Sequence, residues 1–399
     1  MPQGIFEGLK VIDCASFIAA PAAATMLSDF GAEVIKLEPP GAGDPYRASW
    51  TRPGNPASDH NYPWMLEARN KRSLAIDLTR PDAQDVLRRL VAQADVFITN
   101  FPLPVRARLG VDYARLSALN ERLIYASFTG YGETGDEMNK PGFDSTAWWA
   151  RSGLMNGVTR EGEEPVRPLA GMGDHPSAVA MFGCIVTALY RRERTGKGGE
   201  VATSLMANGA WANSHAIQAK LTGATFPARL PRSQARNALA NNYRCGDGRW
   251  IMLTLLNEDR QWPALAKCLE DERLNDPRFA SPADRRTLAR ELVVLMDEAF
   301  ARKSLAEWRV ILDNAGLVFG VVATMDDIPS DRQMIETGVL VPFSDSDMLT
   351  VNSPIFISGE TKVRPRQPPE LGQHSDEILA ELGYDAETIA RLRAGCAVA

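Results

Sequence analysis

Histidine and cysteine, the residue types that most often build metal sites, are scarce in this chain. Its 399 residues include 4 histidines and 5 cysteines. None of them has the H-x-x-x-H or C-x-x-C spacing of a zinc site, so we expect no bound metal. The sequence also lacks a G-x-S-x-G motif, which argues against the nucleophile elbow of an α/β-hydrolase. An odd number of dispersed cysteines is typical of a reducing compartment, and we expect a cytoplasmic protein.

Excess positive charge and long apolar segments are also missing. The formal net charge is −6 and the isoelectric point is about 5.5. Because a nucleic-acid-binding face needs an excess of Lys and Arg, we expect no nucleic-acid partner. No apolar run approaches the roughly 18 residues that span a membrane, and no basic flank and apolar core open the chain. We therefore expect neither a membrane span nor a signal peptide.

Strand and helix patterns alternate along the first half of the chain. Apolar runs that predict buried strands lie at 9–14, 32–37, 73–78, 96–99 and 123–128, and helical spacing occupies 19–30 and 81–93. This alternation predicts an α/β fold with a Rossmann-like parallel sheet, in which ligands bind at the carboxyl ends of the strands. The first crossover, at 15–21, lacks the glycine fingerprint of a NAD or FAD site.

The pattern changes near residue 224. A basic, proline-containing segment leads to a predicted β-hairpin over 242–254 that turns at Asp247-Gly248. Ser304 and Glu307 have the spacing of a capping box at a helix start. We expect a large α/β domain at 1–224, a small α+β domain at 225–330 and a C-terminal segment at 331–399.

One acidic residue stands at a glycine turn before an apolar helical run, in the sequence Gly173-Asp174-His175-Pro176. Asp174 can be an ordinary N-cap, since the positive end of a helix favours an anion. Alternatively, it is a partly desolvated nucleophile toward an activated acyl group. For His175, a role as a plain first-turn residue is favoured over a role in shaping a pocket.

Basic residues flank the predicted strand-end loops. They are Arg69, Lys71, Arg72, Arg106, Arg108 and Lys140. Such a cluster is either a solvated surface or a phosphate-binding rim.

Motifs along the whole chain resemble, in the correct order, the class III coenzyme A transferases, the family of formyl-CoA transferase and carnitine CoA-transferase. These motifs are Gly8–Asp13, Ala20-Pro21, Leu27–Glu38, Asn70–Ser73, Asp95–Phe101, Gly130–Gly132, Thr195–Gly198 and Leu371–His374. The segments most similar to the branch that acts on 2-hydroxy acids and aryl-lactates are Ser16–Pro21, Lys140–Asp144, Gly173–His175 and Tyr243–Cys245.

This resemblance implies an enzyme that moves CoA from an acyl-CoA to a free carboxylic acid, with CoA as a substrate and no tightly bound cofactor. The family's nucleophile falls on Asp174, which would form aspartyl anhydride and aspartyl-CoA thioester intermediates. The resemblance also implies an interlocked homodimer and a C-terminal segment that returns to the large domain. The CoA contacts that it implies are Ile18, Ala19, Glu38, Pro39, Ile76, Asp77, Thr79, Asn100, Phe101, Arg108 and Lys140.

Two departures from the family's patterns narrow the expected reaction. Oxalate-specific members have a glutamine where this chain has Ile18, and their glycine run is missing, so we expect a larger acceptor, a 2-hydroxy or aryl acid. The 2-methylacyl-CoA racemases of the same fold need a histidine where this chain has Phe143, and a phenylalanine side chain cannot accept or donate a proton. A racemase or epimerase remains an alternative, as does a non-catalytic CoA-binding protein, which an intact Asp174 disfavours.

Overall fold

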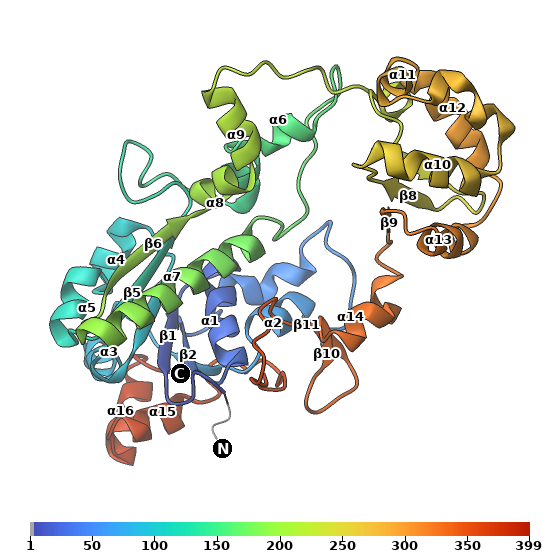
Figure 1. Cartoon of the computed structure of the whole chain (residues 1–399). Coiled ribbons are helices and arrows are strands. Elements are labelled where there is room, and N and C mark those ends of the chain that lie inside the picture. Colours follow the sequence, from blue (N-terminus) through green and yellow to red (C-terminus); the bar gives the residue numbers. More distant parts are fainter. Residues whose placement is uncertain (1–3) are drawn as a thin grey trace. The chain divides into compact units, whose positions relative to one another are not determined.

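The computed structural model describes residues 4–399, which form two compact units. The first unit consists of the residues up to 157 together with 165–224 and 332–399, and the second consists of 158–164 and 225–331. Both units appear in Figure 1.

A six-stranded sheet forms the centre of the first unit (Figure 1). Its strands are β1 (Lys10–Cys14), β2 (Glu33–Glu38), β3 (Arg72–Ala75), β4 (Val96–Thr99), β5 (Ile124–Thr129) and β6 (Gly199–Ser204). The order is β3-β2-β1-β4-β5-β6, and every neighbouring pair is parallel. The predicted α/β fold with a parallel sheet is therefore confirmed. Because the order reverses between β1 and β4, the ends of these two strands flank the crevice where such folds bind ligands.

The sequence prediction misses β6. Exposed and partly buried residues alternate along this edge strand, so it has no continuous apolar run. The other strands of the sheet are buried by helices on both faces and overlap the predicted apolar runs.

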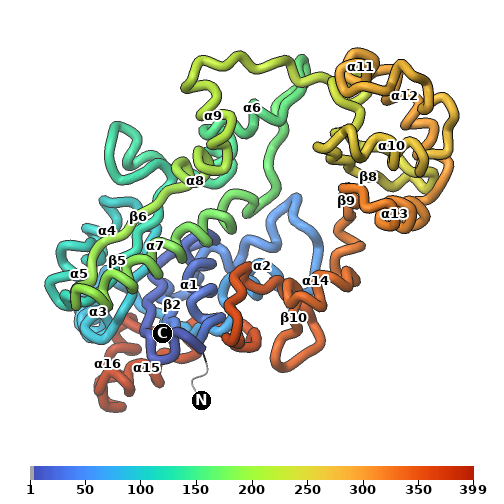
Figure 2. Tube along the Cα trace, in the orientation of Figure 1, coloured from blue at the N-terminus to red at the C-terminus, as the bar shows by residue number. Residues whose placement is uncertain are grey.

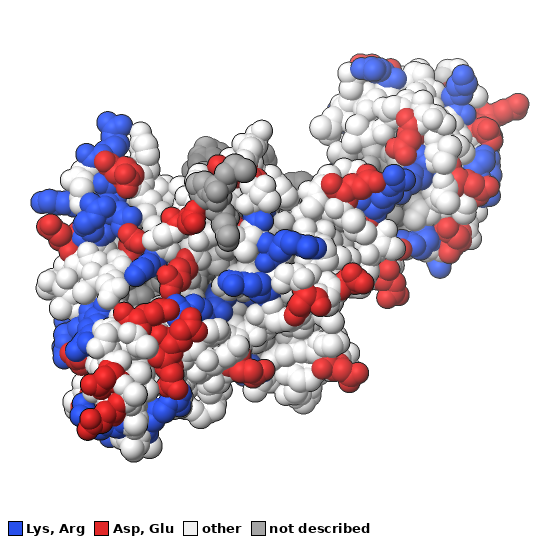
Figure 3. All heavy atoms as spheres, turned by 90° about the horizontal axis from the view of Figure 1, so that it is seen from below, with Lys and Arg blue, Asp and Glu red and all other residues white. Residues whose placement is uncertain are grey.

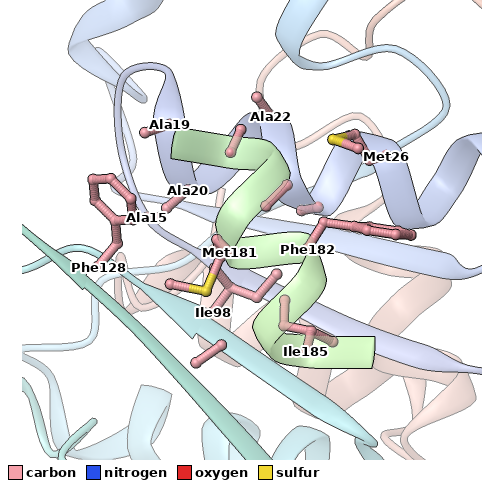
Figure 4. Packing of buried hydrophobic residues seen from close by; sticks show 14 of the residues in the cluster. Ala15, Ala19, Ala20, Ala22, Met26, Ile98, Phe128, Met181, Phe182 and Ile185 are labelled. Carbon is pink, nitrogen blue, oxygen red and sulfur yellow. The ribbon is translucent and has the colours of Figure 1, made fainter. Parts of the chain in front are cut away.

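Two helices, α1 (Ala19–Asp29) and α7 (Asp174–Thr195), cover one face of the sheet. All residues of α1 are buried, and most of them are small, which lets α7 lie close to it. Figure 4 shows Met181 and Ile185 of α7 packed near Ile98 of the sheet and the alanines of α1. Burying each such side chain stabilises the fold by roughly 1.5–3 kcal/mol, and this packing fixes the start of α7 above the crevice.

The opposite face is covered by α3 (Pro81–Gln93), α5 (Tyr113–Leu119), α15 (Ser375–Glu381) and α16 (Ala386–Ala394). Pro81 opens α3, where its missing N–H costs no helical hydrogen bond. The chain end returns to the sheet beside β3: Val398 forms a bridge with Ile76, and the Ala399 N–H donates to the Ala75 carbonyl. Figure 2 shows the C-terminus beside the strands of this sheet.

The second unit contains a small antiparallel sheet of β7 (Asn242–Arg244), β8 (Trp250–Leu253) and β9 (Phe319–Val321). The predicted hairpin is confirmed by the pairing of β7 with β8. The capping box of Ser304 and Glu307 is confirmed as well. The helices of this unit are η3 (Arg232–Gln234), α10 (Glu258–Leu269), η4 (Glu272–Asn275), η5 (Pro277–Phe279), α11 (Pro282–Thr287), α12 (Ala289–Phe300), α13 (Leu305–Asn314) and η6 (Ile328–Ser330).

The remaining helices and strands lie between the elements described above. They are η1 (Pro45–Thr51), α2 (Tyr62–Glu67), α4 (Leu103–Leu109), the π-helical η2 (Asp144–Ala150), α6 (Leu154–Val158), α8 (Leu205–Ala212), α9 (Ser214–Leu221), α14 (Arg332–Glu336), β10 (Leu340–Pro342) and β11 (Leu349–Val351).

Candidate active site

A cavity of about 320 Å³ lies at the crevice between β1 and β4. Half of the predicted site residues line it, namely Ile18, Ala19, Asn100, Phe101, Lys140 and Asp174. The Asn100 amide ties the two strand-end loops together. Its Oδ1 accepts from the Ser16 N–H at 2.9 Å, and its Nδ2 donates to the Ser16 carbonyl at 2.7 Å. Asn100 therefore holds the rim of the cavity in place.

The other predicted residues do not line this cavity: Glu38, Pro39, Ile76, Asp77, Thr79 and Arg108. The Glu38 carboxylate is buried and already accepts hydrogen bonds from Arg47 at 2.7 Å and from Ser73 at 2.9 Å. Ile76 is buried, and Asp77 accepts from the Thr79 hydroxyl at 2.6 Å. Pro39 and Arg108 are exposed. Any contact of Glu38 or Ile76 with a ligand would thus have to come from the main chain.

Besides Lys140, which pairs with Glu137 at 2.6 Å, four of the six clustered basic residues have acidic partners. The pairs are Arg69 with Asp29 at 2.8 Å, Lys71 with Asp13 at 2.8 Å, Arg106 with Glu133 at 2.6 Å, and Arg72 with Glu33, Glu377 and Glu381. For these four, a phosphate-binding rim is disfavoured, because their charges are compensated within the fold. Arg108 and Lys140 are exposed. Figure 3 shows basic and acidic side chains interspersed over one face.

Buried charges beneath the loop after β1 hold an unusual backbone conformation. Phe17 has φ of 66°, a left-handed conformation that costs a residue with a Cβ about 1–2 kcal/mol. Its N–H donates to the Asp44 carboxylate at 3.2 Å, and Asp44 pairs with Lys36 at 3.0 Å. Lys36 also contacts the Ala15 carbonyl. Sequence reasoning missed this network, although charged residues inside apolar strands are a signal for it.

Asp174 is the first residue of α7, but it does not cap the helix. Gly173 occupies the N-cap position without a side-chain cap, and its N–H donates instead to the Asp144 carboxylate at 3.3 Å. Within residues 4–399, the Asp174 carboxylate has no hydrogen-bond partner. The N-cap interpretation is therefore wrong, and this half-buried carboxylate faces the cavity without a structural task.

Burial and a like charge both disfavour ionisation of Asp174. Burial, followed by the negative charge of Asp144, raises the pKa of Asp174 to about 7. The charge of His175 acts in the opposite direction, and that of Glu67 adds to the rise. A carboxylate whose pKa lies near neutrality, in a cavity, is typical of a catalytic group.

Two glycines allow this arrangement. At Gly173, an added Cβ would lie 2.7 Å from the Trp148 ring, which packs beneath the helix start. At Gly171, φ is +75° and an added Cβ would lie 2.9 Å from the His175 ring. Because both positions exclude a side chain, the glycine turn fixes where Asp174 and His175 stand.

Aromatic rings form part of the cavity wall. Phe143 is 58% exposed and meets Phe17 edge to face, with ring centroids 5.9 Å apart. Tyr46 also meets Phe17 edge to face, with ring centroids 6.4 Å apart. Phe143 stands directly before Asp144, so no imidazole is present at that position.

Neither a metal cluster nor a membrane helix is found in the described part of the chain. Among residues 4–399, no group of three or more His, Cys, Asp or Glu residues could hold a metal ion. No helix in this range is long and apolar enough to cross a membrane. The cysteines are free thiols.

Comparison with known proteins identifies the class that this fold and site define. The model of CoA-transferase family III matches residues 6–375, and the chain belongs to this family. The (R)-2-hydroxy-4-methylpentanoate CoA-transferase of Clostridioides difficile is 34% identical over 390 residues, which cover 96% of this chain and 97% of that protein. The cinnamoyl-CoA:phenyllactate CoA-transferase of Clostridium sporogenes is 31% identical, with 97% and 96% covered. The resemblance to the hydroxyacyl and aryl-lactate branch is thus confirmed, and the protein is a CoA-transferase-type enzyme.

Two further similarities concern the fold and the alternative reaction. A CAIB/BAIF family protein from Brucella suis has a similar structure, with a TM-score of 0.84, 27% identity and coverage of 95% of this chain and 100% of that chain. The human alpha-methylacyl-CoA racemase is 27% identical over 388 residues, covering 97% of this chain and 95% of that protein. The shared fold therefore does not by itself separate transfer from racemisation.

Proposed function

We propose that this protein transfers CoA from an acyl-CoA to a free 2-hydroxy or aryl carboxylic acid, with Asp174 as the nucleophile. One observation carries the proposal: a half-buried carboxylate, which has no hydrogen-bond partner among the described residues, stands on the wall of the cavity at the switch point of the sheet. A structural carboxylate in such a place would be paired, as Glu38 and Asp13 are.

The proposed reaction begins with attack of an Asp174 oxygen on the thioester carbonyl carbon. The C–S bond breaks, CoA leaves as a thiolate, and Asp174 holds an acyl anhydride. The thiolate then attacks the aspartyl carbonyl carbon, which releases the first acid as its carboxylate and leaves an aspartyl-CoA thioester.

The second half of the reaction repeats these steps with the acceptor. An oxygen of the acceptor carboxylate attacks the aspartyl carbonyl, expels the thiolate and forms a second anhydride. The thiolate attacks the acceptor's carbonyl carbon, which yields the new acyl-CoA and restores the Asp174 carboxylate. The cycle removes CoA from one acid and attaches it to another, so CoA is a substrate. No step oxidises or reduces a group.

The cavity supports the CoA contacts in part. Ile18, Ala19, Asn100, Phe101 and Lys140 line it beside Asp174. Lys140 is exposed, and its ammonium group pairs with the half-buried Glu137 at 2.6 Å and lies 5.0 Å from the centroid of the Tyr131 ring, so it can exchange Glu137 for a phosphate. Arg108 is exposed as well and is proposed as a second phosphate contact.

The wall of the cavity supports a large acceptor. Phe17 and Phe143 offer ring faces and edges, and Ile18 adds an apolar surface. Such a surface gains free energy from burying an alkyl or aryl group, and it offers no hydrogen bond to the second carboxylate of oxalate.

The presence of Phe143 in the cavity wall disfavours racemisation. A racemase needs two proton carriers on opposite faces of the α-carbon, and Phe143 cannot be one of them. The relatives that are more than 30% identical over nearly the whole chain include two that are named as CoA-transferases, which supports transfer.

We also propose that the chain works as an interlocked homodimer, as the family resemblance implies. Large apolar side chains that are mostly exposed in the first unit support a partner surface; they include Leu169 (73%), Trp211 (81%) and Leu221 (76%). Light scattering on serial dilution tests this proposal, since interlocked chains give no folded monomer. A stable, active monomer would contradict it.

A matrix assay tests the proposed activity. Several acyl-CoAs are each mixed with a panel of free acids, and CoA exchange is read by mass spectrometry. We expect 2-hydroxy or aryl acids to give the highest kcat/KM. A preference for oxalate or formate would contradict the proposed acceptor, and no exchange with any pair would contradict the proposed activity.

A further inference from the structure

Glu67, at the end of α2, and His175, in the first turn of α7, form an ion pair next to Asp174. Oε1 of Glu67 lies 2.7 Å from Nε2 of His175, and Nδ1 of the same ring lies 3.0 Å from the Gly171 carbonyl oxygen. Both ring nitrogens therefore face acceptors. Only an imidazole that is protonated on both nitrogens donates to both.

The two partners differ in exposure. The Glu67 side chain is 2% exposed, whereas that of His175 is 46% exposed. A buried carboxylate is costly unless a nearby positive charge compensates it, and His175 supplies that charge. Burial opposes the charge on His175, but the hydrogen bond to Glu67 and its negative charge prevail and raise the pKa of His175 to about 9.

Two features hold the pair in place. The Thr25 hydroxyl contacts the Glu67 carbonyl, and this anchors the end of α2 to α1. The missing side chain of Gly171 leaves room for the His175 ring. The pair also lines a second, mainly apolar cavity of about 720 Å³ that does not include Asp174 among its lining residues.

We propose that the Glu67–His175 ion pair is a positioning element for the reaction: its imidazolium offsets the charge of Asp144 at Asp174 and thereby keeps Asp174 ionised in the neutral pH range. This inference rests on the proposed role of Asp174 as the nucleophile. His175 acts through Asp174, because both of its ring nitrogens are already engaged within the protein.

The charges around Asp174 come from several elements. Asp144 of η2 and Glu67 of α2 are negative, His175 of α7 is positive, and Tyr46 of η1 is neutral because burial raises the pKa of its hydroxyl. At Asp174 the effect of His175 exceeds that of Glu67, so the pair as a whole favours the carboxylate. Glu67 is itself also faced by Lys71 and Tyr46.

A nuclear magnetic resonance titration of the imidazole signals tests the pair without any assay of activity. The signal of His175 is assigned by its loss in His175→Gln. We expect His175 to titrate at about pH 9, and to move toward the ordinary value of about 6.5 in Glu67→Gln, which keeps the size of the side chain. Titration of His175 near 6.5 in the wild-type protein would overturn the proposal.

The pH profile of kcat/KM tests the link to Asp174. In His175→Gln we expect the acid limb to move up by about one pH unit, so that activity below the limb falls about tenfold while the plateau at high pH is kept. His175→Lys restores the positive charge and should return the acid limb of the kcat/KM profile to its wild-type pH. His215→Gln, in the exposed part of α9, is the matched control and should leave the profile unchanged.

The outcomes separate the two proposals. If His175→Gln lowers the whole profile without moving its acid limb, His175 has only a structural role and the inference is wrong. If the wild-type protein transfers no CoA but the titration shows the protonated pair, the proposed function fails and the pair itself stands.

Discussion

A buried aspartate, Asp13, and a half-buried one, Asp174, have opposite surroundings in the same unit. Asp13, at the end of β1, lies between Lys71 at 2.8 Å and Lys36 at 3.6 Å. Burial alone would raise its pKa, but the charges of Lys36 and Lys71 outweigh burial and hold the pKa below its usual value. Asp174 has a second carboxylate, Asp144, as its neighbour, and its pKa rises to about 7.

This difference distinguishes a carboxylate with a structural role from a reactive carboxylate. The charge of Asp13 is compensated, so the residue contributes to the fold and has no reactive state to offer. The charge of Asp174 is poorly compensated, so its ionised form is less stable and more reactive toward a carbonyl carbon. The comparison predicts that substitutions at the two sites affect different properties.

The largest effect is expected for Asp174→Asn. The amide keeps the size of the side chain but cannot form the anhydride, so transfer should fall by about a thousandfold or more. Because the folded protein no longer has to ionise a group with a raised pKa, the thermal midpoint at about pH 8 should be unchanged or higher. Steady-state assays and thermal unfolding measure both, and retention of more than about a tenth of the activity would contradict the assigned role.

Asp13→Asn should have the complementary effect, a loss of stability. Removing this carboxylate leaves Lys36 and Lys71 buried with less compensation, which costs about 3–5 kcal/mol. Since the pKa of Asp13 is lowered in the folded state, its contribution is complete at neutral pH and disappears as the pH falls through that lowered pKa. Urea unfolding at about pH 7 measures the loss.

Glu336→Gln serves as the control for Asp13→Asn, because its pair with Arg332 is exposed and should contribute at most about 1 kcal/mol. If Asp13→Asn and Glu336→Gln lost the same free energy of unfolding, the proposed difference between buried ion pairs and surface ion pairs would be wrong.

Asp144→Asn should make Asp174 more similar to an ordinary aspartate. The amide oxygen can still accept from the Gly173 N–H, but the like charge is gone, so the pKa of Asp174 falls. In the wild-type protein we expect the acid limb of kcat/KM near pH 7, and in the variant we expect it to move to lower pH. The relative rate at about pH 6 should then rise several-fold. A shift to higher pH would show that Asp144 acts on Asp174 in another way.

The smallest expected effect is α-proton exchange, which should be negligible. Phe143 stands where the racemases of this fold need a histidine, so this position offers no second proton carrier. Incubation of a chiral 2-methylacyl-CoA in deuterated water should give no deuterium uptake above that of the sample without enzyme. Rapid uptake with loss of chirality would support the racemase alternative.

The sequence predicts the parts of the fold that depend on local patterns. Apolar runs locate the first five strands, Pro81 locates the start of α3, and the Asp247-Gly248 turn locates the hairpin of the second unit. The edge strand β6 is not predicted, because its residues alternate between exposed and partly buried positions and form no continuous apolar run. The π-helical turn at 144–150 has no sequence period that would reveal it.

The candidate site is predictable only where one segment carries the signal. The glycine turn and the family resemblance both single out Asp174. Asp144 and Glu67 come from distant segments, and their effect on Asp174 depends on tertiary packing that no spacing in the sequence encodes. The ion pairs of the basic cluster could not be predicted for a related reason: the acidic partners of Arg69 and Arg106 are 40 and 27 residues away in the chain.

Covalent trapping of Asp174 tests the central claim most directly. The wild-type protein is mixed with an acyl-CoA in the absence of an acceptor acid, treated with hydroxylamine, digested and analysed by peptide mass spectrometry. We expect a hydroxamate on the peptide that contains Asp174, dependent on the acyl-CoA and absent from Asp174→Asn. A modification at another residue, or transfer without any modification of Asp174, would contradict the account.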